Sequence, residues 1–304
     1  METTKSADGT VIAYDRTGDG PPLIVAVGAF CDRRSFVPSE GLTARFTVYT
    51  YDRRGRGDSG DTQPYSPDRE VEDLAAVVSV AVSGSGSAPG SRSASASGSG
   101  SASGSGSAAA SGTGPAAASG SGPAPASGSG SVVFAFGHSS GGALVLRAAA
   151  QGVPLTAVAS YEAPFVVLGT REVAQDPADR IREMVAAGRR GDAVRYWMTS
   201  VVRAPAAVVT MMEGSPAWPG LEALTHTLPY DIALTGDQGV PASLSAIAVP
   251  VLVLGGGTSP DWFQRTVHET AAVIPGARLV TMEGYDHGVP PEVIAPVLIE
   301  FFLG

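Results

Sequence analysis

The residues best suited to chemistry lie in the sequence G-H-S-S-G at positions 137–141, which fits the pattern G-x-S-x-G. A serine at its centre can act as a nucleophile, because the flanking glycines permit the sharp turn that exposes its hydroxyl group. An apolar run precedes the motif at 132–136, and good helix formers follow at 143–150. These flanks predict a nucleophile elbow centred on Ser139, and they disfavour the alternative of a Gly/Ser turn without chemistry.

A serine nucleophile also needs hydrogen-bond donors for the oxyanion that forms during acyl transfer. The helix predicted after Ser139 would direct its free N–H groups and the positive end of its dipole at that oxygen. The backbone N–H of Ser140 is therefore one predicted donor. The second donor is expected in residues 27–30, just after a predicted strand.

An imidazole must accept the serine proton and later pass it to the leaving group, because a serine hydroxyl is a weak nucleophile at neutral pH. The chain has four histidines. His138 adjoins the nucleophile, where its side chain points elsewhere, and His226 and His268 lie in other predicted segments. His287 follows a predicted strand near the end of the chain and is the predicted base. The alternative is a loop histidine bonded to solvent.

The elements that must position these residues alternate along the chain. Apolar runs predict strands, and helical spacing predicts helices. The strands are expected at residues 10–14, 23–27, 47–51, 132–136, 155–161, 249–254 and 277–282, and the helices at 71–82, 143–150 and 262–273. This alternation predicts an α/β fold with a mostly parallel, doubly wound central sheet.

One long segment cannot contribute to a core. Residues 83–131 contain only Ser, Gly, Ala and Pro apart from Arg92 and Thr113. Burial could not offset the entropy lost on ordering them, so we expect a low-complexity, disordered insert. We interpret it as a passive loop rather than a tether or partner-binding arm. Residues 1–82 and 132–304 are then predicted to form one domain.

Composition limits the partners and the compartment. The formal net charge is −9 at pH 7, and no basic tract occurs, so nucleic-acid binding is not expected. The single cysteine, Cys31, excludes an intramolecular disulfide and indicates a reducing compartment. The first residues are polar and no apolar run is long enough to cross a bilayer, so we expect a cytoplasmic protein with no membrane partner.

Several segments of the chain resemble the α/β-hydrolase fold family. The resemblance is carried by the elbow at 137–141, by Y-D-R-R-G-R-G-D-S at 51–59, by P-V-L-V-L-G-G at 250–256 and by G-Y-D-H-G at 284–288. It covers nearly the whole chain outside the insert and implies a helical cap over residues 164–248. The arginines after the predicted strand at 47–51 are expected to shape a turn beside the active site rather than to bind substrate.

The resemblance also implies roles for residues that composition and spacing leave unassigned. It implies that Ala29 or Phe30 supplies the second N–H group of the oxyanion hole. In the cap, Trp197, Met212 and Trp218 are either packing residues or the lining of an acyl pocket.

A carboxylate must orient His287, and the chain offers two. Most members of the family carry it after the seventh strand, where this chain reads G-G-G-T-S-P-D at 255–261 and has a hydroxyl residue at the usual position. Asp261 is nearby, but it could instead cap the helix that follows. In haloalkane-dehalogenase-like members the acid follows the sixth strand, which here ends just before Glu162. We expect Glu162 to be the acid, with Asp261 as the second choice.

These residues predict a serine hydrolase that forms an acyl-enzyme on Ser139. Its expected partner is a small-molecule carboxylic ester, lactone or related acyl substrate, and neither cofactor nor metal is implied. The alternative is a non-catalytic ligand-binding protein on the same fold, because the usual carboxylate after the seventh strand is missing. The presence of both Ser139 and His287 disfavours that alternative.

Overall fold

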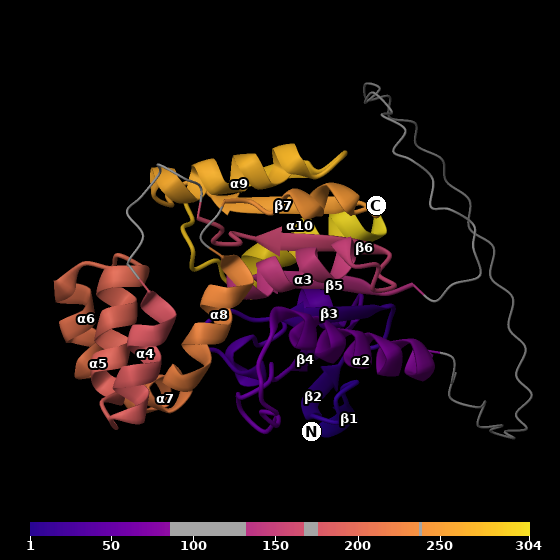
Figure 1. The fold of residues 1–304 in the computed structure, drawn as a ribbon. Helices are drawn as coiled ribbons and strands as arrows, with labels where there is room; N and C mark the ends of the chain where they lie inside the picture. The colour runs from indigo at the N-terminus through magenta and orange to yellow at the C-terminus, as the bar shows by residue number, and fades with distance from the viewer. Residues whose placement is uncertain (86–131, 167–175, 237–238) are drawn as a thin grey trace, which may run out of the picture.

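A central sheet organises the molecule, and the computed structural model describes residues 1–85, 132–166, 176–236 and 239–304. Within these residues the sheet has eight strands in the order β1-β2-β4-β3-β5-β6-β7-β8 (Figure 1). The strands are β1 (Glu2–Lys5), β2 (Val11–Thr17), β3 (Pro22–Ala26), β4 (Thr47–Tyr51), β5 (Phe134–His138), β6 (Ala157–Tyr161), β7 (Val251–Gly256) and β8 (Arg278–Met282).

The pairing of the strands places one set of loops together. β2 runs antiparallel to both β1 and β4, and the other neighbouring pairs in the sheet are parallel. The mostly parallel sheet predicted from the sequence is therefore confirmed. Because parallel strands end at the same edge, the loops that follow β3, β4, β5, β6, β7 and β8 all leave the sheet on one side.

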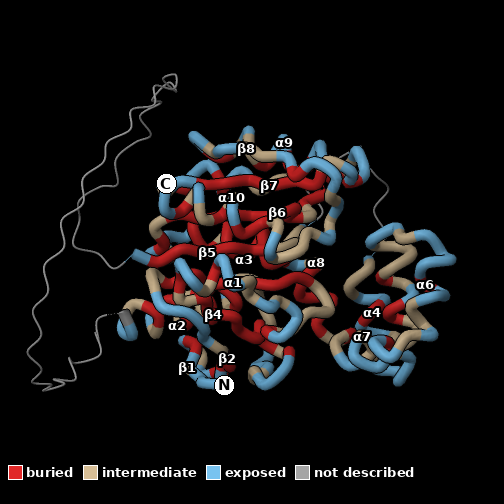
Figure 2. The backbone as a smooth tube through the Cα atoms, turned by 180° about the vertical axis from the view of Figure 1, so that it is seen from behind, coloured by how far each residue is buried: buried red, intermediate tan, exposed pale blue. Residues whose placement is uncertain are grey.

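Helices cover both faces of the sheet. α2 (Pro67–Ser85), α3 (Ser140–Ala150) and α9 (Asp261–Val273) pack on one face, and α1 (Glu40–Thr43) and α10 (Pro291–Leu303) pack on the other. In β3, Ile24 and Ala26 belong to the first apolar cluster and Leu23 and Val25 to the second. A strand buried on both faces has a continuous apolar sequence, and the strands in the middle of the sheet are accordingly buried (Figure 2).

The helical cap lies beyond the carboxyl ends of the strands. Its helices are α4 (Pro177–Ala186), α5 (Arg190–Tyr196), α6 (Ala206–Glu213), α7 (Trp218–Leu224) and α8 (Leu228–Thr235), with a π-helical segment at Trp197–Val201. These helices have apolar clusters of their own, and α8 connects them to the sheet by packing on α3 (Figure 1). No helix in the described parts of the chain is long and apolar enough to span a membrane.

Two elements were not predicted from the sequence. β1 is a mostly exposed edge strand of polar residues, so it lacks the apolar pattern of a strand. α10 contains Pro296, which interrupts its helical sequence pattern. In addition, α2 continues to Ser85, past the predicted start of the insert at residue 83. The remainder of the predicted insert, residues 86–131, lies outside the described residues.

Candidate active site

The predicted site residues all follow strands at the carboxyl edge of the sheet. Ser139 lies between β5 and α3, Glu162 directly follows β6, and His287 lies in the loop between β8 and α10. Ala29 and Phe30 lie in the loop after β3. The parallel order β3-β5-β6-β7-β8 therefore gathers residues that are far apart in the sequence.

Ser139 has the strained backbone of a tight strand-to-helix turn. Its φ of 57° and ψ of −128° lie in a region that side-chain-bearing residues rarely adopt. Its N–H group donates to the carbonyl of Tyr161 at 2.9 Å, so the turn is tied to β6. A Cβ atom on Gly141 would lie 2.1 Å from the carbonyl oxygen of Ala26, so only glycine fits there. Gly141, two residues after the nucleophile, thus allows the elbow to pack against the end of β3.

The loop after β3 lies directly against the nucleophile. A Cβ atom on Gly28 would lie 2.7 Å from the Cβ atom of Ser139 and 3.2 Å from its Oγ atom. Glycine is therefore required for this close approach. Phe30, two residues later, has a φ of 58°, which again places strained backbone beside the serine. Both predicted second oxyanion donors, Ala29 and Phe30, follow this contact directly.

Glu162 is the carboxylate that the structure joins to His287. Its Oε2 atom lies 2.7 Å from the Nδ1 atom of His287, and its Oε1 atom accepts the N–H group of Gly256 at 2.8 Å. Burial of Glu162 raises its pKa, but its polar contacts, above all the hydrogen bond from His287, outweigh this effect and leave the pKa below its ordinary value. The His287 side chain is 38% exposed, so its ring is accessible to a ligand.

The second-choice carboxylate, Asp261, lies elsewhere. It is the first residue of α9 and is exposed, in the place where a carboxylate interacts favourably with a helix dipole. In the loop after β7, the usual place of the acid in the family that the chain resembles, the sequence predicted a hydroxyl residue, and the buried residue there is Ser259. The structure therefore pairs His287 with the carboxylate after β6, and the last residue of β7, Gly256, contributes its N–H group to that carboxylate.

The loop that carries His287 is held by its neighbours. The Nε2 atom of His138 lies 2.8 Å from the carbonyl oxygen of His287, and the hydroxyl group of Tyr161 donates to the carbonyl of Asp286. The ring of Phe263 stacks on that of His287, with 4.9 Å between centroids. Burial of His138, together with the nearby His287, lowers the pKa of His138 to about 4. His138 therefore stays neutral at pH 7 and can donate from Nε2 to the loop.

Sequence reasoning missed the importance of the arginines after β4. Arg53, Arg54 and Arg56 are at most 1% exposed, although they were expected to shape a turn. Arg53 and Arg56 contact the loop after β3, and Arg53 also contacts the hydroxyl group of Ser140. One feature of the sequence could have indicated a buried ion-pair cluster, namely several arginines close together in an acidic chain. Buried arginines need carboxylate partners, and Glu70, in the next helix, is one of them.

The cap packs apolar side chains against Phe30, in the loop after β3. The rings of Phe30 and Trp197 pack edge to face with centroids 6.2 Å apart. Met212 and Trp218 belong to a second apolar cluster that also contacts Phe30. Trp218 is 8% exposed and its indole N–H group donates to Glu222 at 3.0 Å, so packing accounts for it. Trp197 begins a π-helical segment, a geometry frequent at functional sites.

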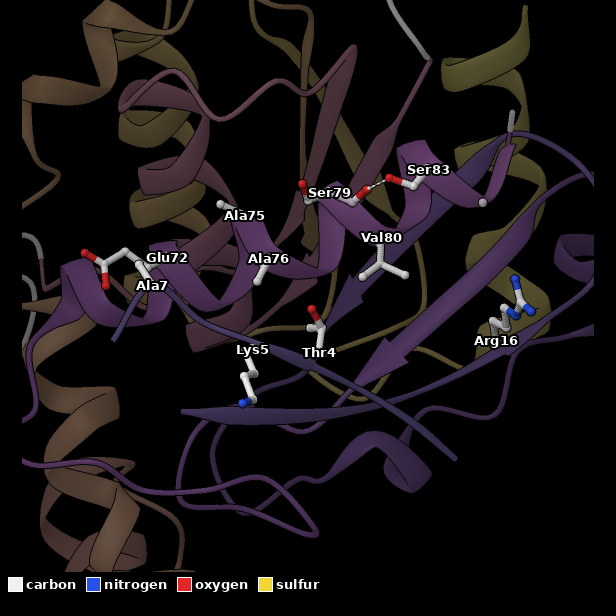
Figure 3. Close-up of a pocket in the computed structure, with 11 residues that line it drawn as sticks. Thr4, Lys5, Ala7, Arg16, Glu72, Ala75, Ala76, Ser79, Val80 and Ser83 are labelled. Carbon is white, nitrogen blue, oxygen red and sulfur yellow. Dashed lines mark hydrogen bonds between the residues drawn. The ribbon is translucent and has the colours of Figure 1, made fainter. Parts of the chain in front are cut away.

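A separate groove lies between α2 and the β1–β2 edge of the sheet, with a volume of about 720 Å³ (Figure 3). It is lined by Thr4, Lys5, Arg16, Glu72 and Val80 among others, all of them partly or fully exposed. It contains none of the residues around Ser139. The groove is therefore not part of the candidate active site.

The described residues offer no obvious metal site. They contain no group of three or more His, Cys, Asp or Glu side chains placed to hold a metal ion. Cys31 is free, and burial raises the pKa of its thiol, which disfavours the reactive thiolate.

Comparisons with known proteins agree with the fold described above. The Alpha/beta hydrolase family model matches residues 23–295. No match was found among curated proteins. Among solved structures, an alpha/beta hydrolase from Sphaerobacter thermophilus DSM 20745 is 42% identical, with a TM-score of 0.79 and an alignment that covers 99% of this chain and 100% of that one.

Two more distant structures share the fold. An enol-lactonase from Burkholderia xenovorans LB400 is 19% identical, with a TM-score of 0.62 and complete coverage of both chains. An esterase from Rhodococcus sp. ECU1013 is 18% identical, with a TM-score of 0.59 and coverage of 99% of this chain and 98% of that one. At these identities the similarity establishes the fold of this chain and not its substrate.

Proposed function

This chain belongs to the alpha/beta hydrolase family, and we propose that it is a serine hydrolase acting on a small carboxylic ester, lactone or related acyl substrate. Ser139 is the nucleophile, His287 the general base and Glu162 the acid that orients the base. The observation that carries this proposal is the 2.7 Å contact between Glu162 and His287, on loops beside the strained elbow that presents Ser139.

In the first half of the reaction, the hydroxyl oxygen of Ser139 attacks the substrate carbonyl while its proton passes to the Nε2 atom of His287. Glu162 holds the Nδ1 atom of His287, so Nε2 is the ring atom available for this proton. As the tetrahedral intermediate collapses, the bond from carbonyl carbon to leaving group breaks. His287 returns the proton to the departing oxygen, which leaves an acyl group on Ser139.

In the second half, water takes the place of the leaving group. His287 accepts a proton from the water as it attacks the acyl carbon, and it then protonates Ser139 as the carboxylic acid departs. The buried carboxylate of Glu162 stabilises the imidazolium in both halves, and its lowered pKa keeps it ionised at neutral pH.

The negative charge on the carbonyl oxygen needs the two N–H donors of the oxyanion hole. The N–H group of Ser140 is at the start of α3, so the helix dipole adds to its effect. Ala29 or Phe30 supplies the second donor from the loop that Gly28 brings against Ser139. Both donors belong to the backbone, so they are in place before the charge develops.

The substrate class follows from the neighbours of the site and from the relatives. Phe30 follows the contact between Gly28 and Ser139 and is only partly buried, so it offers aromatic surface near the nucleophile, which suits a small apolar acyl or alkoxy group. The named esterase and enol-lactonase have the same fold and support acyl chemistry at an oxygen leaving group. We therefore place esters and lactones before other acyl substrates.

Labelling with a fluorophosphonate tests the proposal, because this probe reacts only with an activated serine. Intact-mass measurement should show one adduct on the wild type and none on Ser139→Ala. A site map of the labelled protein should assign the adduct to Ser139. A folded wild type that takes up no probe would refute the hydrolase proposal and favour the alternative of a non-catalytic ligand-binding protein.

A further inference from the structure

A sealed cluster of charged side chains lies behind the nucleophile elbow. Arg53, Arg56, Glu70 and Asp231 are each at most 2% exposed. Arg53 binds Glu70 through two nitrogens, at 2.5 and 2.8 Å. Two guanidinium groups therefore face two carboxylates, and their charges cancel within the protein. Such a cluster is costly to desolvate, so its geometry must be well satisfied if it is to persist.

Asp231 is the centre of the cluster, and it comes from cap helix α8. One of its oxygens, Oδ1, accepts hydrogen bonds from Arg53 at 2.9 Å, from Arg56 at 2.8 Å and from the hydroxyl group of Ser140 at 2.6 Å. Its other oxygen accepts from Arg56 at 2.9 Å. Burial raises the pKa of Asp231, but Arg56 and Arg53 outweigh burial and keep it below the ordinary value. The carboxylate is therefore ionised and fully bonded.

The same arginines hold the backbone of the loop after β3. Arg56 donates to the carbonyl oxygen of Gly28 at 2.5 Å, and Arg53 donates to that of Val27 at 3.2 Å. In a trans peptide the C=O and N–H groups of one plane point in opposite directions. When Arg56 holds the carbonyl of Gly28 toward the cluster, it also directs the N–H group of Ala29 away from it.

Ser140 connects the cluster to the other donor of the oxyanion hole. Its hydroxyl group accepts from Arg53 at 3.0 Å and donates to Asp231, while its own backbone N–H group is the first predicted donor. The two segments that provide the oxyanion hole therefore bond to the same buried carboxylate, one directly and one through Arg56.

We propose that Arg53, Arg56 and Asp231 are positioning residues for the oxyanion hole, and that cap helix α8 thereby controls the chemical step as well as covering the site. The proposal rests on the serine hydrolase function proposed above. It predicts that disturbing this cluster lowers kcat through weaker binding of the oxyanion. Loss of substrate affinity would be secondary.

Three variants separate positioning from packing. Ser140→Ala removes the hydroxyl group that bonds to Asp231 and leaves the backbone N–H group in place. Arg56→Lys keeps the positive charge opposite Asp231, but an ammonium group lacks the rigid fork that spans both Asp231 and the carbonyl of Gly28. Ser160→Ala is the matched control, since the hydroxyl group of Ser160 is equally buried and has no hydrogen-bond partner in the described part of the chain.

The readouts are hydrolysis of p-nitrophenyl acetate and binding of an aryl trifluoromethyl ketone, which forms a charged tetrahedral adduct on serine. Complete loss of an oxyanion donor costs roughly 10²–10³ in kcat, so misdirecting one should cost about tenfold or more. We expect this loss in Ser140→Ala and Arg56→Lys, with KM within about threefold and ketone affinity reduced in proportion to kcat. Ser160→Ala should match the wild type.

Two outcomes would overturn the proposal. One is that Ser140→Ala and Arg56→Lys match Ser160→Ala in kcat and in ketone affinity. The other is that kcat falls while ketone affinity stays unchanged, because the defect would then lie outside the oxyanion hole.

A measurement without turnover keeps this proposal distinct from the proposed function. Failure of the wild type to react with the fluorophosphonate would refute the hydrolase activity itself. Hydrogen exchange of the amides at residues 26–31 would still report on positioning. Faster exchange in Ser140→Ala and Arg56→Lys than in Ser160→Ala supports a cluster that holds this loop, and equal exchange in all three refutes it.

Discussion

Two polar clusters lie beside Ser139, and they differ in how far water reaches them: the exposed cluster of Glu162 and His287, and the sealed cluster of Arg53, Arg56, Glu70 and Asp231. On one side, Glu162 is buried, but its partner His287 is 38% exposed. On the other side, Arg53 and Asp231 are both at most 2% exposed. The first cluster has one face open to a ligand, and the second has none.

This difference in exposure suits one cluster to proton transfer and the other to holding the backbone in place. A half-exposed imidazole can exchange a proton with substrate, so the Glu162–His287 pair can change its charge during a reaction. The arginines of the sealed cluster stay charged throughout, and what they provide is a fixed direction for the backbone groups that they bind. Under the proposed function, polar residues of similar type thus have different tasks on the two sides of one serine, according to their burial.

Removing the charge of Glu162 should give the largest effect on activity. Glu162→Gln keeps the shape of the side chain but can no longer stabilise the imidazolium or enforce the tautomer of His287. We expect the rate of fluorophosphonate labelling to fall by roughly 10²–10⁴, with the folded state retained by circular dichroism. A labelling rate equal to that of the wild type would show that the exposed cluster does not activate Ser139.

The sealed cluster should dominate stability in the same way that the exposed one dominates activity. Asp231→Ala would leave two buried guanidinium groups opposite Glu70 alone, which should lower the free energy of unfolding by about 3–5 kcal/mol. Glu162→Ala should lower it by only about 1–2 kcal/mol, because His287 can remain neutral and reach solvent. Urea denaturation at pH 7.5 compares the two variants. Equal losses would contradict the contrast drawn between the clusters.

His138 lies beside the exposed cluster but is itself shielded from water. The stability of the folded protein should therefore depend on pH through this residue. Its pKa is lowered to about 4 in the folded protein, from 6.5 in an unfolded chain. Between these values the unfolded state binds the extra proton, so stability is fully present above pH 6.5 and is lost as the pH falls toward 4. This one group should cost the folded state about 2 kcal/mol between pH 7 and pH 5.

A substitution isolates that contribution. The free energy of unfolding, measured by urea denaturation, should differ between pH 7 and pH 5 by about 2 kcal/mol in the wild type because of His138, and His138→Asn should remove most of this difference. A difference of about 2 kcal/mol corresponds to about one and a half pKa units. His268→Asn is the matched control, because His268 is exposed on α9, and it should keep the pH dependence of the wild type. The same loss of stability in His138→Asn as in the wild type would place the proton-binding group elsewhere.

The sequence predicted the exposed cluster better than the sealed one, for a physical reason. Ser139 and Glu162 sit directly after apolar strands, so strand ends located them, and the shared edge of a parallel sheet brought them together. The sealed cluster joins Arg53 after β4 to Asp231 in the cap, 178 positions later. Nothing in local periodicity indicates which distant carboxylate meets a given arginine. The polar strand β1 escaped prediction because it is an edge strand that buries little.

Substitution of Asp261 should have the smallest effect on stability and activity, and it tests whether burial explains the difference between the two clusters. Asp261 was the second candidate for the acid, but it is an exposed residue at the start of α9. Its charge should therefore interact mainly with the helix dipole. Asp261→Asn should lower the free energy of unfolding by about 0.5 kcal/mol and leave the labelling rate of Ser139 within about twofold. A large drop in labelling, with Glu162→Gln still reactive, would transfer the acid role to the loop after β7. Activity would then depend on an exposed carboxylate, and burial would no longer explain the division of tasks around the serine.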